Sequence, residues 1–102
     1  MKKPIRLIDA AQAEYELQYD RLFDHSVSKA ERYRIEILKG LQAIVAKPNG
    51  YGYVPGQTFR SYGPTKKEKY RIAYIESETE IIVLAIYYSG SHNPLYWIDR
   101  AF

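Results

Sequence analysis

The chain has 102 residues, of which 46% are hydrophobic and 26% are charged, and it contains no cysteine. This composition is too apolar for a disordered chain, and the length suits a single α+β or similar domain, residues 1–102, with one core. A chain without cysteine has neither disulfides nor thiolate metal sites, and two histidines without clustered carboxylates lead us to expect no metal and no cofactor.

Neither end of the sequence nor its interior suggests a membrane protein. Met1–Arg6 lacks the apolar stretch of a signal peptide, and no apolar run approaches the roughly 20 residues that span a bilayer. We therefore expect a cytoplasmic protein without a membrane partner. The net charge of +3 is only a weak indication of anionic partners, but the cations are concentrated in one stretch of sequence. They are Arg60, Lys66, Lys67, Lys69 and Arg71.

The first third of the chain predicts a strand and a helix. Ile5–Ile8 is a short candidate strand. Asp9 is placed to cap the following helix, with Gln12 as its reciprocal partner. Apolar residues at helical spacing predict that this helix runs from about Ala10 to Phe23, and the polar stretch Asp24–Val27 is expected to end it.

A second helix is predicted directly afterwards. Ser28 and Glu31 have the spacing of a capping box, and the apolar periodicity continues to about Ala46. Lys47–Gly50 ends this helix, because the residue before proline resists helical geometry and Asn-Gly favours a turn. Two amphipathic helices with so short a connection predict an antiparallel helical hairpin.

Three strands are predicted in the second half. Thr58–Tyr62 is a plausible strand, and Lys69–Ile75 alternates in the manner of a strand with one buried face. That alternation directs Tyr70, Ile72 and Tyr74 to one face and Arg71 to the other. After a polar break, Ile81–Ile86 is apolar on both faces, as expected of a central strand.

The order of these elements predicts the architecture. Leu95–Arg100 is predicted to add a short C-terminal helix capped by Asn93, which completes the order β-α-α-β-β-β-α. We expect an α+β fold of two layers, in which an N-terminal strand precedes an antiparallel helical hairpin packed on one face of a small, mainly antiparallel sheet. The other face is expected to be partly open and to carry Arg71.

Several stretches, taken in this order, resemble a known family. They are the short first strand, the Ala-rich start of the first helix at 9–13, Ser28–Arg32, Lys47–Gly50, Arg60, Tyr70–Tyr74 and the apolar strand Ile81–Ile86. In order and spacing they resemble the RelE/ParE superfamily of toxins from bacterial type II toxin–antitoxin modules. The resemblance covers nearly the whole chain, and the Tyr-Arg-Ile-x-Tyr segment is its most specific part. It implies a cognate antitoxin as partner, with acidic residues that complement the positive charge.

The family divides by mechanism, and each branch implies a different target. RelE-like members are ribosome-dependent ribonucleases that cut messenger RNA, so the ribosome and mRNA would be partners. In that branch the resemblance implies a catalytic site and a phosphate-binding site. The catalytic candidates are Arg71, His92 and Tyr96, with Tyr88 behind them, and the RNA- or phosphate-binding candidates are Arg60, Lys66, Lys67 and Lys69.

The chemistry fits RNA cleavage through the 2′-hydroxyl, which needs a base, an acid and cations around the phosphorane-like transition state. Arg71 suits the stabilising role and His92 titrates near neutrality. Each candidate also has a simpler interpretation: Arg71 as a sheet-face cation paired with glutamate, His92 as a solvated loop residue, and Tyr96 as an anchor for the terminal helix.

ParE-like members instead inhibit DNA gyrase without catalysis, and two features favour that branch. The helical hairpin is long, and Ser89–Ser91 stands where a basic residue usually follows the last strand. Ribosome-dependent mRNA cleavage is the leading hypothesis, gyrase inhibition the alternative, and an inactive antitoxin-binding relative the third.

Overall fold

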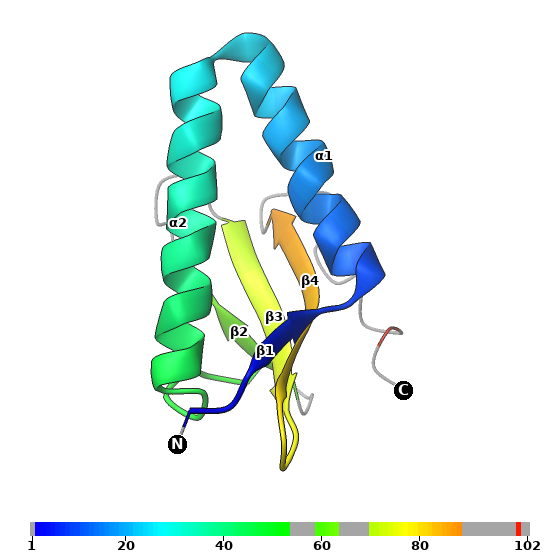
Figure 1. The fold of residues 1–102 in the computed structure, drawn as a ribbon, viewed down its shortest axis with the longest axis vertical. Coiled ribbons are helices and arrows are strands. Elements are labelled where there is room, and N and C mark those ends of the chain that lie inside the picture. Colours follow the sequence, from blue (N-terminus) through cyan, green and yellow to red (C-terminus); the bar gives the residue numbers. More distant parts are fainter. Residues whose placement is uncertain (1, 54–58, 64–69, 89–99, 101–102) are drawn as a thin grey trace.

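The computed structural model describes residues 2–53, 59–63, 70–88 and 100 (Figure 1). The elements follow one another as β1 (Ile5–Leu7), α1 (Asp9–His25), α2 (Val27–Ala46), β2 (Arg60–Tyr62), β3 (Tyr70–Glu76) and β4 (Ile81–Tyr88). This is the predicted order from the first strand to the last. The predicted terminal helix lies outside the described residues, apart from Arg100.

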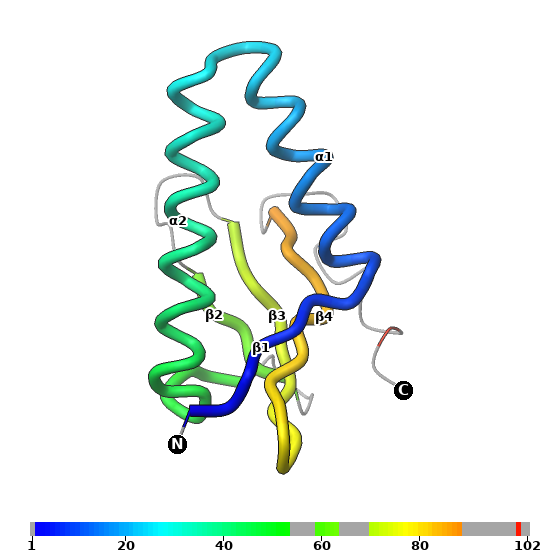
Figure 2. Tube along the Cα trace, viewed as in Figure 1, coloured from blue at the N-terminus to red at the C-terminus, as the bar shows by residue number. Residues whose placement is uncertain are grey.

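The four strands form one mixed sheet in the order β1-β4-β3-β2 (Figure 2). β4 is central, as its apolar sequence predicted: it pairs in parallel with β1 and antiparallel with β3. β2 continues the sheet antiparallel to β3. The helical hairpin covers one face, with α1 packed mainly on β4, so the predicted two-layer α+β fold is confirmed.

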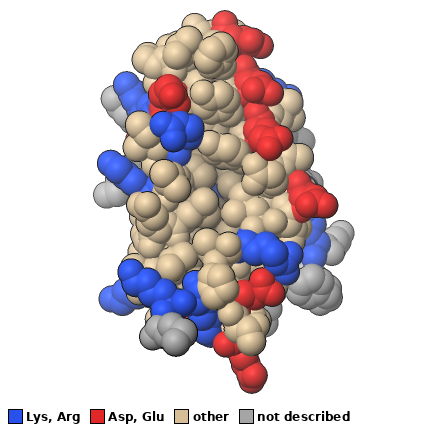
Figure 3. Space-filling view, viewed as in Figure 1, with Lys and Arg blue, Asp and Glu red and all other residues tan. Residues whose placement is uncertain are grey.

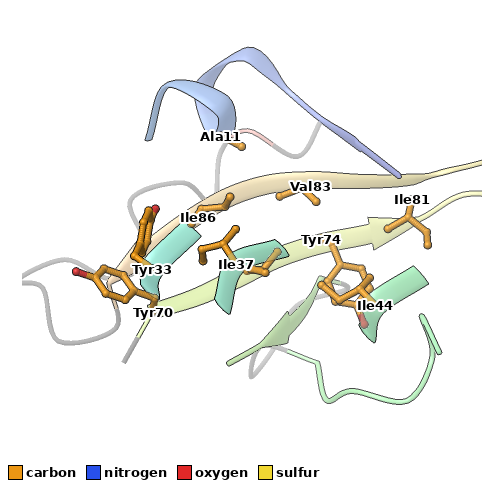
Figure 4. Packing of buried hydrophobic residues seen from close by; sticks show 10 residues of the cluster. Ala11, Tyr33, Ile37, Ile44, Tyr70, Tyr74, Ile81, Val83 and Ile86 are labelled. Atoms are coloured by element: carbon orange, nitrogen blue, oxygen red, sulfur yellow. The ribbon is translucent and has the colours of Figure 1, made fainter. Parts of the chain in front are cut away.

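The main core lies between the hairpin and the sheet (Figure 4). Tyr70, Ile72 and Tyr74 of β3 all face the helices, as the alternation predicted. They meet Ile37 and Ile44 of α2, and all five side chains are at most 8% exposed. Burial of these apolar side chains from both layers is the main force that holds the hairpin on the sheet.

A bulge in β4 changes which face of the sheet the later residues of this apolar strand point to. Tyr74 pairs with Val83 and Ala73 pairs with Ala85, which leaves Leu84 as the extra residue. Val83 and Ile86 both contribute to the helix-facing core, although simple alternation would place them on opposite faces. Leu84 and Ala85 both belong to the cluster on the other face, which is what a bulge with one extra residue produces.

That other face differs from the partly open surface that the sequence predicted. It carries a second apolar cluster built from Phe59, Ala73, Ile82, Leu84, Ala85 and Tyr87. Ala73, Leu84 and Ala85 have no exposed surface, and Ile82 and Tyr87 are only 7% and 6% exposed. The prediction of an open face was therefore wrong along β4, where side chains on both faces are buried.

Both predicted helix caps are displaced in the structure. Ile8 occupies the N-cap of α1 without a side-chain hydrogen bond, and Asp9 is already the first helical residue. The cap of α2 is Ser26, whose Oγ accepts a hydrogen bond of 3.3 Å from Lys29 N. Glu31 forms an ion pair with Arg34 instead of completing a capping box with Ser28. Ser26, two residues before the predicted cap, takes the N-cap position because α1 continues to His25 and leaves only Ser26 between the helices.

Among the described residues, no helix is both long enough and apolar enough to cross a membrane.

Candidate functional site

Arg71 lies on the sheet face opposite the helices, as predicted. It stands directly across from Tyr87 on β4, and residues paired in this way share a face. Its Nε donates a hydrogen bond of 2.6 Å to Ser61 Oγ, and its Nη2 donates one of 3.2 Å to Ser61 O. Ser61 Oγ also lies 3.1 Å from Tyr87 Oη. β2, β3 and β4 thus each contribute one polar side chain to this site.

The Arg71 guanidinium is held at a fixed position by this surrounding. Ser61 is only 9% exposed, and Arg71 is half-buried. Gly63 makes room for the guanidinium, since a Cβ on Gly63 would lie 2.7 Å from Arg71 Nη1. The hydroxyl and carbonyl of Ser61 therefore take the place of the glutamate that the simpler interpretation assigned to Arg71. A fixed guanidinium whose fork is only partly used can bind a phosphate or a carboxylate.

Arg60 lies on the opposite face of the sheet from Arg71. It pairs with Tyr74, whose ring faces the helices. Its guanidinium donates to the carbonyl oxygen of Tyr51 and, over 2.9 Å, to Tyr53 Oη, and its Cζ lies 4.1 Å from the centre of the Tyr53 ring. The two arginines of the predicted site are therefore not brought together, and Arg60 holds the segment after α2 against the edge of β2.

The remaining candidates are mostly beyond the described part of the chain. Lys66, Lys67, Lys69, His92 and Tyr96 all lie outside the described residues. Tyr88 ends β4 with 44% of its surface exposed, and its ring centre lies 5.4 Å from that of Tyr70. Tyr88 thus lies on the helix side of the sheet, away from Arg71. Among the described residues, no three His, Cys, Asp or Glu side chains are grouped closely enough to hold a metal ion.

Sequence reasoning missed Ser61, which accepts the hydrogen bonds of Arg71, and Tyr87, whose hydroxyl binds that of Ser61. Ser61 lay within a correctly predicted strand, so alternation could have placed it opposite Arg60 and Tyr62. Tyr87 could not be placed by alternation, because the bulge at Leu84 reverses the facing of every later residue in β4.

Tyr74 is the most strongly perturbed titratable group among those described. It has no exposed surface, and its Oη donates a hydrogen bond of 2.6 Å to Pro48 O. Burial raises the pKa of Tyr74 to about 12, and the nearby Arg60 cation opposes that rise. The hydroxyl is therefore a neutral anchor that ties β3 to the end of α2.

This shift predicts a loss of stability in alkali. Because the pKa of Tyr74 is about 12 in the folded chain and about 10 when unfolded, its contribution is intact below pH 10 and declines from pH 10 to 12. By pH 11 the free energy of unfolding should fall by about 1.4 kcal/mol on this account. Urea denaturation at pH 8 and pH 11 measures this fall in the free energy of unfolding. In Tyr74→Phe, which has no hydroxyl to ionise, the fall should be smaller by about this amount. An equal fall in both proteins would contradict the assignment.

Comparison with known proteins finds similarity among solved structures. No family model matches the sequence, and no curated protein matches it either. Among solved structures, the chain is similar to one described as "Chromosomal ParDE TA system from P. aeruginosa". The two chains are 17% identical, the alignment covers 83% of this chain and 94% of that one, and the TM-score is 0.69. At this identity the likeness establishes a shared fold.

Proposed function

We propose that this chain is the toxin of a type II toxin–antitoxin module, with a cognate antitoxin as its partner. The observation that carries the proposal is the fold shared with a chain of a ParDE system over 94% of that chain. The RelE/ParE resemblance of the sequence, found in the same order of elements, supports it from a second direction.

For the mechanism, we favour inhibition of DNA gyrase by protein binding. A nuclease site of the expected kind needs several cations around one phosphate. Of the candidate cations, the structure describes Arg60 and Arg71, and these two lie on opposite faces of the sheet, where each guanidinium contacts groups of its own chain. The long hairpin, with helices of 17 and 20 residues, also fits the ParE-like branch.

Ribosome-dependent mRNA cleavage is the second candidate, and the cluster around Arg71 is the observation that favours it. The guanidinium is fixed by Ser61, and the Tyr87 hydroxyl lies beside it. Such a group could stabilise charge on a phosphate during cleavage. In this candidate Arg71, His92 and Tyr96 are the proposed catalytic residues, while Lys66, Lys67, Lys69 and Arg60 bind the RNA.

A paired assay tests both mechanisms with the same preparation. Purified protein is added to a gyrase supercoiling reaction and to a translating-ribosome reaction whose mRNA is analysed by primer extension. We expect blocked supercoiling and intact mRNA. Arg71→Ala should leave the supercoiling block within about twofold, whereas for a nuclease it should reduce cleavage by at least about 100-fold, the cost of removing one transition-state donor.

The outcomes separate the alternatives. Cleaved mRNA with unaffected supercoiling would replace gyrase inhibition by the nuclease mechanism. Inducible expression in a bacterial host provides the test of toxicity itself: growth should stop on induction and resume when the antitoxin is co-expressed. Normal growth with abundant soluble protein would contradict the toxin proposal and leave an inactive relative.

A further inference from the structure

A groove runs between the two helices on the outer side of the helical layer. α1 and α2 diverge from their connection at Ser26 toward β1 (Figure 1). One recess of about 230 Å³ and a second of about 210 Å³ share Tyr15 and Arg34 in their linings, so they lie side by side, and together they are called the inter-helix groove. The rest of its lining is Leu7, Gln12, Glu16, Tyr19, Asp20, Ile37, Leu38 and Leu41.

The floor of the inter-helix groove is apolar and accessible. Leu38 is 48% exposed, and Tyr15, Tyr19 and Leu41 are half-buried. Tyr15 is fixed by stacking on Tyr33, with ring centres 5.5 Å apart. An apolar stripe of this kind between two helices matches the surface on which a third helix packs its own apolar face.

The α1 rim of the inter-helix groove is acidic, although the chain as a whole carries a net charge of +3. Glu16, Asp20 and Asp24 follow one another at intervals of four residues along α1, an arrangement of like charges that destabilises a helix. Within the described part of the chain, no cation forms an ion pair with these three carboxylates.

Basic side chains lie along the α2 side (Figure 3), and Arg34 is the one that lines both recesses. Its Nε is 2.7 Å from Glu31 and forms an ion pair with it. Figure 3 shows a hollow of uncharged side chains between α1 and α2, with acidic side chains gathered along the α1 side. The inter-helix groove thus joins an apolar floor to a negative rim.

We propose that the inter-helix groove binds an amphipathic helix of a partner protein whose apolar stripe is flanked by lysine or arginine. The apolar stripe covers Leu38 and Leu41, and the basic flank meets Glu16 and Asp20 on α1. An acidic flank would instead face these carboxylates and be repelled. The inference does not rest on the proposed function, because it is argued only from the lining and the charges of the groove.

Two designed peptides test the proposal. Each is a fluorescein-labelled amphipathic helix of about 20 residues with a leucine stripe, flanked by lysine in one and by glutamate in the other. Fluorescence anisotropy at low salt measures their binding to the full chain. We expect the lysine peptide to bind at least about tenfold more tightly and to lose affinity as salt rises.

Variants of the chain locate the binding. The double variant Glu16→Lys/Asp20→Lys should reverse the preference toward the glutamate peptide, and Leu38→Ser should weaken both peptides at least about fivefold. Glu78→Lys is the matched control, an exposed charge reversal in the turn between β3 and β4 that should change neither affinity. Circular dichroism checks the fold of each variant. The double reversal lies at exposed positions, so it decides the question even if Leu38→Ser does not fold.

Three results would overturn the proposal. One is equal affinity for the two peptides, and another is a preference that the double reversal leaves unchanged. The third is a concentration-dependent dimer, seen by light scattering, that Leu38→Ser abolishes, since this would assign the inter-helix groove to a second copy of the chain.

Discussion

Deletion of Ile72 in β3 should abolish cooperative folding, whereas deletion of Ala85 in the neighbouring strand β4 should leave a folded protein. The difference follows from the bulge at Leu84. Deletion of Ala85 removes one residue from the bulge and so restores simple alternation along β4. Leu84 then pairs with Ala73, and Ile86 stays paired with Ile72 on the helix face.

Deletion of Ile72 has no such compensation, because β3 has no extra residue to give up. If the residues before the deletion move by one position, Arg71 takes the place of Ile72 at a position with no exposed surface. If the residues after it move instead, Ala73 and Tyr74 exchange faces and the Tyr74 ring leaves the helix-facing core. The loss of a buried isoleucine together with a buried unpaired charge or a misplaced core tyrosine costs more than about 5 kcal/mol, comparable to the whole stability of a small domain.

Thermal and urea denaturation followed by circular dichroism measures both deletions. The Ala85 deletion should unfold cooperatively with a loss of about 1–3 kcal/mol, because the strand must repack near the removed residue. The Ile72 deletion should show no cooperative transition. Similar destabilisation by the two deletions would mean that β4 has no bulge at Leu84.

The fold could be predicted from sequence because its signals are local and periodic. The face of β3 that meets the helices follows from three residues at every second position, and β4 is recognisable as central from an unbroken apolar run. The bulge gives no such signal, because an unbroken apolar run is compatible with any facing of its residues. The second buried face was missed for the same reason: Ile82 and Leu84 looked like the second side of one core strand rather than members of a separate cluster.

For the candidate site, the sequence could predict which face a single residue points to, but not which residues lie close together in space. Arg71 was correctly placed on the face away from the helices. Arg60 was grouped with it because the family resemblance implied a phosphate-binding cation on the preceding strand, yet the register of β2 on β3 turns Arg60 toward the helix side. That register depends on the pairing of Ser61 with Ala73, a contact between strands that no pattern within either strand can specify.

The end of β4 depends on an ion pair that replaces a missing strand. β1 stops at Leu7, which pairs with Val83, so no strand of the described residues lies beside the edge of β4 beyond that point. Glu14 of α1 accepts a hydrogen bond of 3.2 Å from Ile86 N, and Arg100 donates one of 3.1 Å to Leu84 O. The two side chains also bind each other, with Arg100 Nη1 2.9 Å from Glu14 Oε1.

Glu14→Ala should therefore lower the free energy of unfolding by about 3 kcal/mol, because it leaves a buried backbone donor and a partly buried cation without this partner. Glu14→Gln should lose about half as much, since the amide oxygen still accepts from Ile86 N. The matched control is Arg6→Ala, which breaks an ion pair of the same 2.9 Å length with Glu80.

Burial distinguishes the two pairs. The side chains of Arg100 and Glu14 are 25% and 16% exposed, against 55% and 32% for Arg6 and Glu80. Water already solvates the Arg6–Glu80 pair, so its loss should produce no measurable change in the urea midpoint. A double-mutant cycle of Glu14→Ala with Arg100→Ala isolates their coupling, which should exceed about 1 kcal/mol. Additive effects of the two substitutions would mean that Glu14 and Arg100 stabilise β4 independently of each other.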